Sequence, residues 1–160
     1  MEVMEEVKEG KAKERGMTLI LLACALFVAL FFVFGESKGG GKEERIFEVR
    51  GREITVWVAD SPAEITKGLG GRESLSEESG LFFIFPESNR HGIWMKGMHF
   101  PIDVIWLNKE LEVIDMRTHI VPETFPEIFY PALPAHYVLE TRAGTVDEIG
   151  VQRGDRAIFR

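Results

Sequence analysis

The sequence has a single cysteine among its 160 residues, and this scarcity excludes several classes of protein. Cys24 lies inside an apolar run, so the soluble remainder can form no disulfide, zinc finger or cysteine-based active site. Basic residues are also outnumbered, with 19 Lys and Arg against 26 Asp and Glu, and they form no basic block. A net charge of −7 argues against non-specific nucleic-acid binding, so we predict no nucleic-acid partner.

Signatures of common catalytic and cofactor sites are missing as well. The four histidines, at positions 91, 99, 119 and 136, have neither the His-x-His nor the His-x-x-x-His spacing typical of zinc ligands. No Gly-x-Ser-x-Gly nucleophile elbow occurs, and the glycine-rich segment 68–71 lacks the Gly-Lys-Thr ending of a phosphate-binding loop. The sequence therefore predicts no metal and no other cofactor, and it leaves open whether the protein is an enzyme.

A run of 18 residues from Met17 to Phe34 carries no charge. As an α-helix it would be about 27 Å long, close to the bilayer hydrocarbon thickness of about 30 Å. We therefore predict that residues 17–34 are an uncleaved transmembrane anchor, through which the protein contacts the membrane. Two alternatives stay open: cleavage as a signal peptide, for which the run is long, and lipidation of Cys24, which ends a lipobox-like tetrapeptide.

The rest of the chain divides into three segments around this run. Residues 1–16 form a charged N-terminal tail, residues 35–44 a glycine-rich flexible linker, and residues 45–160 the folded domain. Lys11, Lys13 and Arg15 lie close to the run, which favours a cytoplasmic N-terminus. The predicted localisation is a single-pass membrane protein whose β domain is extracytoplasmic.

Short strands dominate the predicted secondary structure of this domain. Segments 45–49 and 54–59 flank a turn and predict a hairpin, and Ser61 and Glu64 form a capping-box pattern that begins a short helix ending at Gly68. Thr145 and Glu148 predict a second short helix in the same way, and residues 122–134, with four prolines, predict an irregular loop. Further strands are expected at 80–85, 91–96, 102–107, 111–118, 137–142 and 156–159. The fold class predicted is all-β, an antiparallel sandwich or barrel with two short helices.

Several spaced motifs in residues 45–159 resemble the domain of unknown function 192 family. They are Gly68-Leu69 with Gly71-Arg72-Glu73-Ser74-Leu75, Gly80-Leu81-Phe82-Phe83-Ile84-Phe85-Pro86, Ile93-Trp94-Met95-Lys96, Phe100-Pro101-Ile102-Asp103-Val104-Ile105-Trp106, Tyr137-Val138-Leu139-Glu140, Ala143-Gly144 and Gly154-Asp155. The resemblance implies a sandwich-like β domain, often exported or membrane-tethered, with no settled activity. This chain departs from the family pattern at Gly97-Met98-His99, where the family commonly has Asn-Thr, and at Gly70, where it often has Met.

The candidate ligand-binding residues are Arg72, Lys96, Asp103 and Glu140, each the charged member of an apolar motif. Asp103 enters a strand whose neighbours favour burial, and an unpaired buried charge costs several kcal/mol, so it needs a partner such as Lys96 or Arg72. The cluster has two interpretations: a structural ion pair, or a site that binds an anion and moves a proton.

Three functions follow from these residues. The first is a membrane-anchored, non-catalytic accessory module that binds a small ligand or a protein partner. The second is a hydrolase or lyase acting on a sugar or envelope polymer through Asp103 and Glu140. The third is Cu(I) binding through Met95, Met98 and His99. Independently, the aromatic, proline-rich segment 125–137 is expected to cover the open end of the sandwich, or else to form a binding lip.

Overall fold

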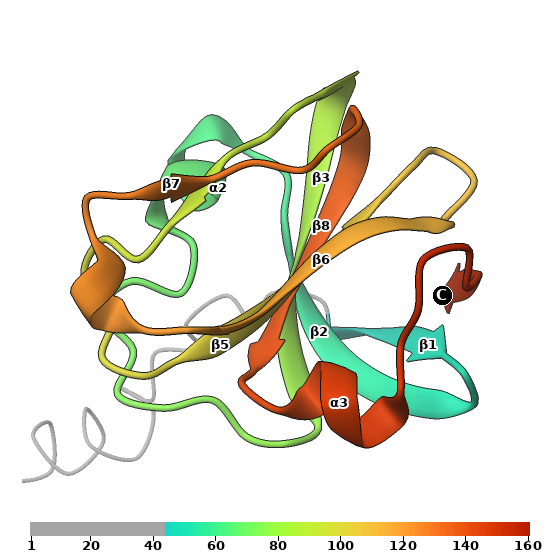
Figure 1. The fold of residues 1–160 in the computed structure, drawn as a ribbon, viewed down its shortest axis with the longest axis horizontal. Helices are drawn as coiled ribbons and strands as arrows, with labels where there is room; N and C mark the ends of the chain where they lie inside the picture. The colour runs from blue at the N-terminus through green and yellow to red at the C-terminus, as the bar shows by residue number, and fades with distance from the viewer. Residues whose placement is uncertain (1–43) are drawn as a thin grey trace, which may run out of the picture. The chain divides into compact units, whose positions relative to one another are not determined.

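The computed structural model describes residues 44–160, which form a mostly β domain with two short helices (Figure 1). In chain order its elements are β1 (Glu44–Val49), β2 (Arg52–Ala59), α2 (Pro62–Lys67), β3 (Ser79–Asn89), β4 (Ile93–Trp94), β5 (Ile102–Leu107), β6 (Val113–Ile120), a 3₁₀ turn (Pro122–Thr124), β7 (Ile128–Phe129), β8 (Ala135–Arg142), α3 (Thr145–Ile149) and β9 (Ala157–Phe159). The predicted transmembrane run 17–34 and most of the linker lie outside the described residues. Within residues 44–160, no helix is long and apolar enough to cross a membrane.

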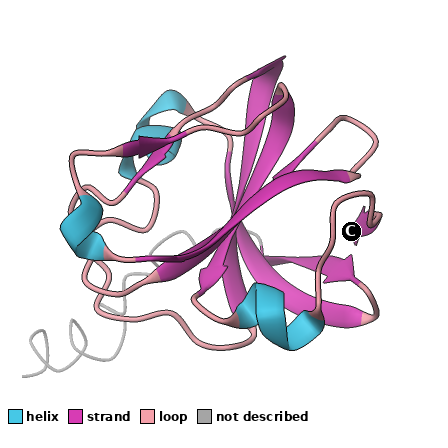
Figure 2. Cartoon of the chain, in the orientation of Figure 1, coloured by secondary structure: helices cyan, strands magenta, loops and turns pink. Residues whose placement is uncertain are grey.

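Seven strands form one sheet in the order β6-β5-β8-β3-β2-β1-β9, and β4 pairs with β7 in a separate ribbon (Figure 2). The predicted hairpin is confirmed, because β1 and β2 pair antiparallel from Glu44–Trp57 to Val49–Arg52. An entirely antiparallel arrangement is wrong, since β2 and β3 run parallel and α2 lies in the connection between them. Parallel neighbours need such a crossover connection, which explains why a helix follows β2.

The seven-stranded sheet curls on itself, so the fold is barrel-like rather than a sandwich of two sheets. Backbone hydrogen bonds join the segment that leads into β9 to the segment that leads into β6. Val113, the first residue of β6, donates its N–H to the Asp155 carbonyl at 2.8 Å, and Ala157, the first residue of β9, donates to the Leu111 carbonyl at 2.9 Å. One hydrophobic cluster takes a buried side chain from each of the seven strands, among them Phe47, Ile54, Phe82, Ile105, Val113, Leu139 and Ala157. This cluster is the inner core of the curl.

A second hydrophobic cluster lies on the other face of β2, β3, β5 and β8. It includes Leu81, Phe83, Val104 and Val138 from the sheet, and it is covered by Ile65 of α2, by Leu69 and Leu75 of the following loop, and by Ile93 of β4. Because successive side chains of a strand point to opposite faces, each of these four strands contributes to both cores. The cover over this outer face forms the walls of the candidate site.

The two short helices begin differently. At α2 the predicted capping box is present, with Glu64 N–H donating to Ser61 Oγ and Ser61 N–H donating to the Glu64 carboxylate. Thr145 was predicted to cap α3, and this is wrong. Gly144, in the left-handed region at φ 94°, is the N-cap, and Thr145 is the first helical residue. Glu148 pairs with Arg142 at 2.7 Å.

Candidate functional site

Glu140 is a buried acid in the middle of the outer face of the sheet. On β8 it lies between Leu81 of β3 and Val104 of β5, and its side chain is 4% exposed. Its Oε2 atom is buried and has no hydrogen-bond partner among residues 44–160. Burial disfavours the charged carboxylate and raises the pKa of Glu140 to about 8. At neutral pH the group is therefore a carboxylic acid, which can donate one hydrogen bond as well as accept.

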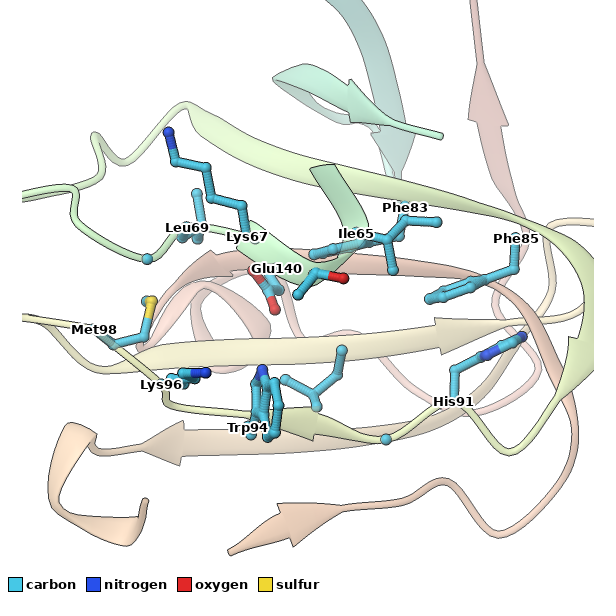
Figure 3. Close-up of a pocket in the computed structure, with 15 residues that line it drawn as sticks. Ile65, Lys67, Leu69, Phe83, Phe85, His91, Trp94, Lys96, Met98 and Glu140 are labelled. Atoms are coloured by element: carbon cyan, nitrogen blue, oxygen red, sulfur yellow. The ribbon is translucent and has the colours of Figure 1, made fainter. Parts of the chain in front are cut away.

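A cavity of about 100 Å³ opens beside this acid, and we call it the Glu140 cavity (Figure 3). Its apolar lining comes from Ile65, Leu69, Phe83, Phe85, Ile93 and Met98, and its polar lining includes Lys67, His91, Lys96 and Glu140. Figure 3 shows the Glu140 carboxyl group among these side chains, with Trp94 and Lys96 on one side and Leu69 and Lys67 on the other. The lining surface of the Glu140 cavity is about equally apolar and polar, and the cavity is smaller than most small-molecule sites.

His91, in the segment between β3 and β4, makes one contact with β3 and one with β5, and the two hold one wall of the cavity in place. The His91 ring stacks on Phe85 with centroids 3.5 Å apart and planes inclined by 8°. The indole of Trp106, which is fully buried, donates to the His91 carbonyl at 2.9 Å. These contacts fix the segment that leads into β4, so the cavity is formed before any ligand binds.

Asp103 belongs to a different part of the fold. Its register partner on β8 is Thr141, one position from Glu140, so Asp103 lies on the opposite face of the sheet from Glu140. Asp103 is fully buried and accepts backbone hydrogen bonds from His119 at 2.8 Å and from Val146, at the start of α3, at 2.9 Å. The predicted ion pair with Lys96 or Arg72 is wrong, because backbone N–H groups satisfy this carboxylate. Asp103 and Glu140 are therefore not a carboxylate pair that could flank one glycosidic bond.

Arg72 and Lys96 are exposed and each lies over an indole ring. The Arg72 guanidinium is 4.2 Å from the Trp57 ring centre, and the Lys96 ammonium is 5.3 Å from that of Trp94. Lys96 lines the Glu140 cavity. Arg72 lines a neighbouring open hollow of about 320 Å³, which we call the Arg72 hollow. Of the four predicted residues, the structure thus brings Lys96 and Glu140 to one cavity, Arg72 beside it, and Asp103 elsewhere.

The three residues predicted to bind Cu(I) have unlike surroundings. Met95 is 1% exposed and packs in the outer-face core, Met98 lines the Glu140 cavity, and His99 is exposed. Within the described part of the chain, no group of three or more His, Cys, Asp or Glu side chains is placed to hold a metal ion. The structure gives Met95 a packing role.

The aromatic segment 125–137 does not fold down as a continuous cover. Phe125, Ile128, Tyr130 and Leu133 are each between 41% and 57% exposed. The segment is held by Asp115, whose Oδ2 accepts the Ala132 N–H at 2.8 Å. Burial acts to raise the pKa of Asp115, but hydrogen bonds from Ala132, Arg153 and Met116 outweigh it and lower the pKa.

Sequence reasoning missed several residues that line the cavity, among them Lys67, His91 and Trp94. They come from α2, the segment after β3, and β4, and only the tertiary fold brings them together. A signal for the cavity was nonetheless present at Glu140. Side chains two positions apart in a strand lie on the same face, so Glu140 shares its face with the apolar Val138. A charged residue on an apolar face is the signal that could have been recognised.

The fold and site together define a small β domain whose curled sheet carries an unpaired buried acid facing a cavity. The chain belongs to the domain of unknown function 192 family, an uncharacterized family whose model matches residues 45–159. UPF0127 protein PF1050 of Pyrococcus furiosus is 36% identical over 114 residues, which is 67% of this chain and 90% of that protein.

Two solved structures share the fold. A Sinorhizobium meliloti protein suggested to regulate transcription has 31% identity and a TM-score of 0.68, over 72% of this chain and 92% of that one. A protein of unknown function from Novosphingobium aromaticivorans has 25% identity and a TM-score of 0.66, over 72% of this chain and 83% of that one. The family predicted from the motifs is therefore confirmed.

Proposed function

We propose that residues 44–160 form a non-catalytic binding module that takes a small ligand in the Glu140 cavity. The observation that carries this proposal is the buried, unpartnered Oε2 atom of Glu140 beside an open cavity. A buried polar atom without a partner costs free energy of about 1–3 kcal/mol, and a ligand that hydrogen-bonds to it recovers that cost. Catalysis by a pair of carboxyl groups has less support, because Glu140 is the single carboxyl group that lines the cavity among residues 44–160.

The size and chemistry of the cavity limit the ligand. A cavity of about 150 Å³ in a protein core holds benzene, so a cavity of about 100 Å³ admits a group of a few heavy atoms. The part of the ligand that enters must combine an apolar portion with at least one hydrogen-bonding atom for the neutral Glu140 carboxyl group. Any part of the ligand that does not fit in the Glu140 cavity has to lie outside it, toward Trp94 and Lys96.

Ligand binding can be tested on the full chain in detergent. A library of small alcohols, amides and carboxylic acids is screened by thermal shift at pH 6.5, and dissociation constants of the compounds that bind are measured by calorimetry. Glu140→Leu replaces the carboxyl group with an apolar side chain and removes the hydrogen bond, so binding should weaken at least tenfold. Glu110→Leu, at an exposed acid in the turn between β5 and β6, is the matched control and should bind as the wild type does. Equal binding by both variants contradicts the proposal, as does a library without any binder.

We also propose that the module is held at a membrane by residues 17–34, with the β domain on the extracytoplasmic side. The support is the uncharged run and the basic residues before it, Lys11, Lys13 and Arg15. In spheroplasts, external protease should degrade the β domain of the full chain. Changing the three basic residues to Glu should reverse the orientation and protect the domain. A chain that fractionates as a soluble protein with residues 17–34 intact contradicts the anchor.

A further inference from the structure

Three cationic side chains gather around the mouth of the Glu140 cavity and the neighbouring Arg72 hollow. Lys67 lines both, Lys96 lines the cavity, and Arg72 lines the hollow. Backbone contacts bring these distant positions together. Gly71 N–H donates to the Gly97 carbonyl at 2.8 Å, and a Cβ added at Gly70 would lie 3.0 Å from the Lys67 carbonyl and 3.1 Å from that of Lys96. The loop after α2 is therefore packed tightly against the Lys96–Gly97 turn.

The cavity and the hollow also share one row of side chains on the outer face of the sheet. Register pairs join Trp57 to Leu81, Leu81 to Glu140, and Glu140 to Val104 across β2, β3, β8 and β5. Trp57 and Leu81 line the Arg72 hollow, and Glu140 lines the cavity. A single ligand lying along this row would have its ends in the two spaces.

None of these three cations, Lys67, Arg72 and Lys96, forms an ion pair with an acidic side chain of residues 44–160. In the described part of the chain, Arg50, Arg142, Arg153 and Arg160 form ion pairs with Asp155, Glu148, Asp115 and Glu48. The one acid that lines the Arg72 hollow, Glu64, already accepts the Ser61 N–H at 3.2 Å in the capping box. The chain is acidic overall, yet these three cations without an acidic partner lie together around the cavity and the hollow.

The two indole contacts orient the cations without neutralising them. Arg72 lies over Trp57 and Lys96 over Trp94, and a cation–π contact leaves the positive charge available to a second partner. The fork of N–H donors on an arginine guanidinium matches the two oxygens of a carboxylate.

We propose that the ligand of the Glu140 cavity is a small carboxylic acid, whose carboxylate is bound by Arg72, Lys96 and Lys67 while its neutral end enters the cavity beside Glu140. This inference rests on the proposed binding function and names the chemical class of the ligand. Charge repels a cationic ligand from this mouth, and moving a charged carboxylate from the exposed mouth into the cavity would cost desolvation free energy. The carboxylate therefore lies at the mouth and the uncharged end lies inside.

Matched pairs of acids and amides test the charge requirement on the full chain in detergent. The probes are aliphatic and hydroxylated monocarboxylic acids of three to seven carbons, each with its primary amide, measured by calorimetry at low ionic strength and pH 6.5. The best acid should bind the wild-type chain at least tenfold tighter than its amide, because a charge-assisted hydrogen bond is roughly twice as strong as a neutral one. The preference should shrink in 0.5 M salt, since the cations are exposed.

Two double variants with equal charge change complete the test. Arg72→Gln with Lys96→Gln should abolish the preference for the acid, so that acid and amide bind this double variant with equal affinity. Arg52→Gln with Lys109→Gln removes two exposed cations elsewhere and should leave the preference intact. Equal binding of acid and amide by the wild type, or an unchanged preference in the first double variant, overturns this inference while the binding function stands. If neither acids nor amides bind, the proposed function falls, and the inference falls with it.

Discussion

Replacing Glu140 with glutamine should stabilise the domain at neutral pH, which is an unusual outcome for a change at a fully buried position. Glutamine has nearly the same shape as a protonated glutamic acid and never ionises. In the wild type, burial raises the pKa of the carboxyl group from 4.5 to about 8. Between these values the folded protein holds a proton that the unfolded chain releases, so folding becomes less favourable as the pH rises.

The magnitude follows from the width of this interval. From 4.5 to pH 7 is 2.5 pH units, and each unit corresponds to about 1.4 kcal/mol, so the carboxyl group lowers wild-type stability by about 3 kcal/mol at pH 7. From 4.5 to about 8 the loss reaches about 5 kcal/mol and then stays constant. Below pH 4.5 the wild type and Glu140→Gln should be equally stable, because the acid is protonated in both the folded and the unfolded chain.

Urea unfolding of residues 42–160, which form one compact unit, measures the difference. Free energies of unfolding are compared between the wild type and Glu140→Gln at several pH values from 4 to 9. The control is Glu110→Gln, at an exposed acid that folding does not desolvate. A difference between wild type and Glu140→Gln that stays constant from pH 4.5 to pH 8 would refute the reasoning, and so would a destabilised variant at pH 8.

The other buried acids should respond in the opposite direction, because each is hydrogen-bonded to backbone N–H groups. Asp103→Asn leaves one of two backbone donors facing an amide N–H, so it should destabilise the domain by about 3 kcal/mol, measured by urea unfolding at pH 7. If Asp103→Asn leaves the free energy of unfolding nearly unchanged, Asp103 does not tie α3 to the sheet. Asp115→Asn should cost about 2 kcal/mol at pH 7 and speed hydrogen exchange at Ala132. Because the pKa of Asp115 is lowered, the difference in unfolding free energy between the wild type and Asp115→Asn should shrink as the pH falls below 3.8. A difference that grows below pH 3.8 would contradict the lowered pKa of Asp115.

Local patterns in the sequence were sufficient to predict most of the elements. The β1–β2 hairpin, the capping box at Ser61 and Glu64, and β5 depend on neighbours in the chain, so alternation and capping residues identify them. The parallel pairing of β2 with β3 depends on residues more than 20 positions apart, and no local pattern encodes it. The segment 91–96 was predicted as a full strand, and only Ile93–Trp94 pairs, because its partner β7 has two residues.

The candidate site depended on register, which the sequence does not reveal. Asp103 and Glu140 were both recognised as charged residues in apolar strands, but their partners were not predictable. Asp103 aligns with Thr141, and Glu140 aligns with Val104, so the two acids face opposite sides of the sheet. A shift of one residue in that pairing would have placed them on one face. Charge complementarity favoured Lys96 or Arg72 as the partner of Asp103, whereas the fold supplies backbone N–H groups at His119 and Val146.

The central claim is that Glu140 presents a neutral carboxylic acid to the cavity at physiological pH. Selective ¹³C labelling of glutamate, with Glu140→Gln used to assign its signal, allows the ionisation of this one carboxyl group to be followed by NMR. We predict that the Glu140 carboxyl resonance titrates with a midpoint near pH 8 in the ligand-free protein. A midpoint near 4.5 would mean that the group is charged and solvated at neutral pH, and it would contradict the account of the site.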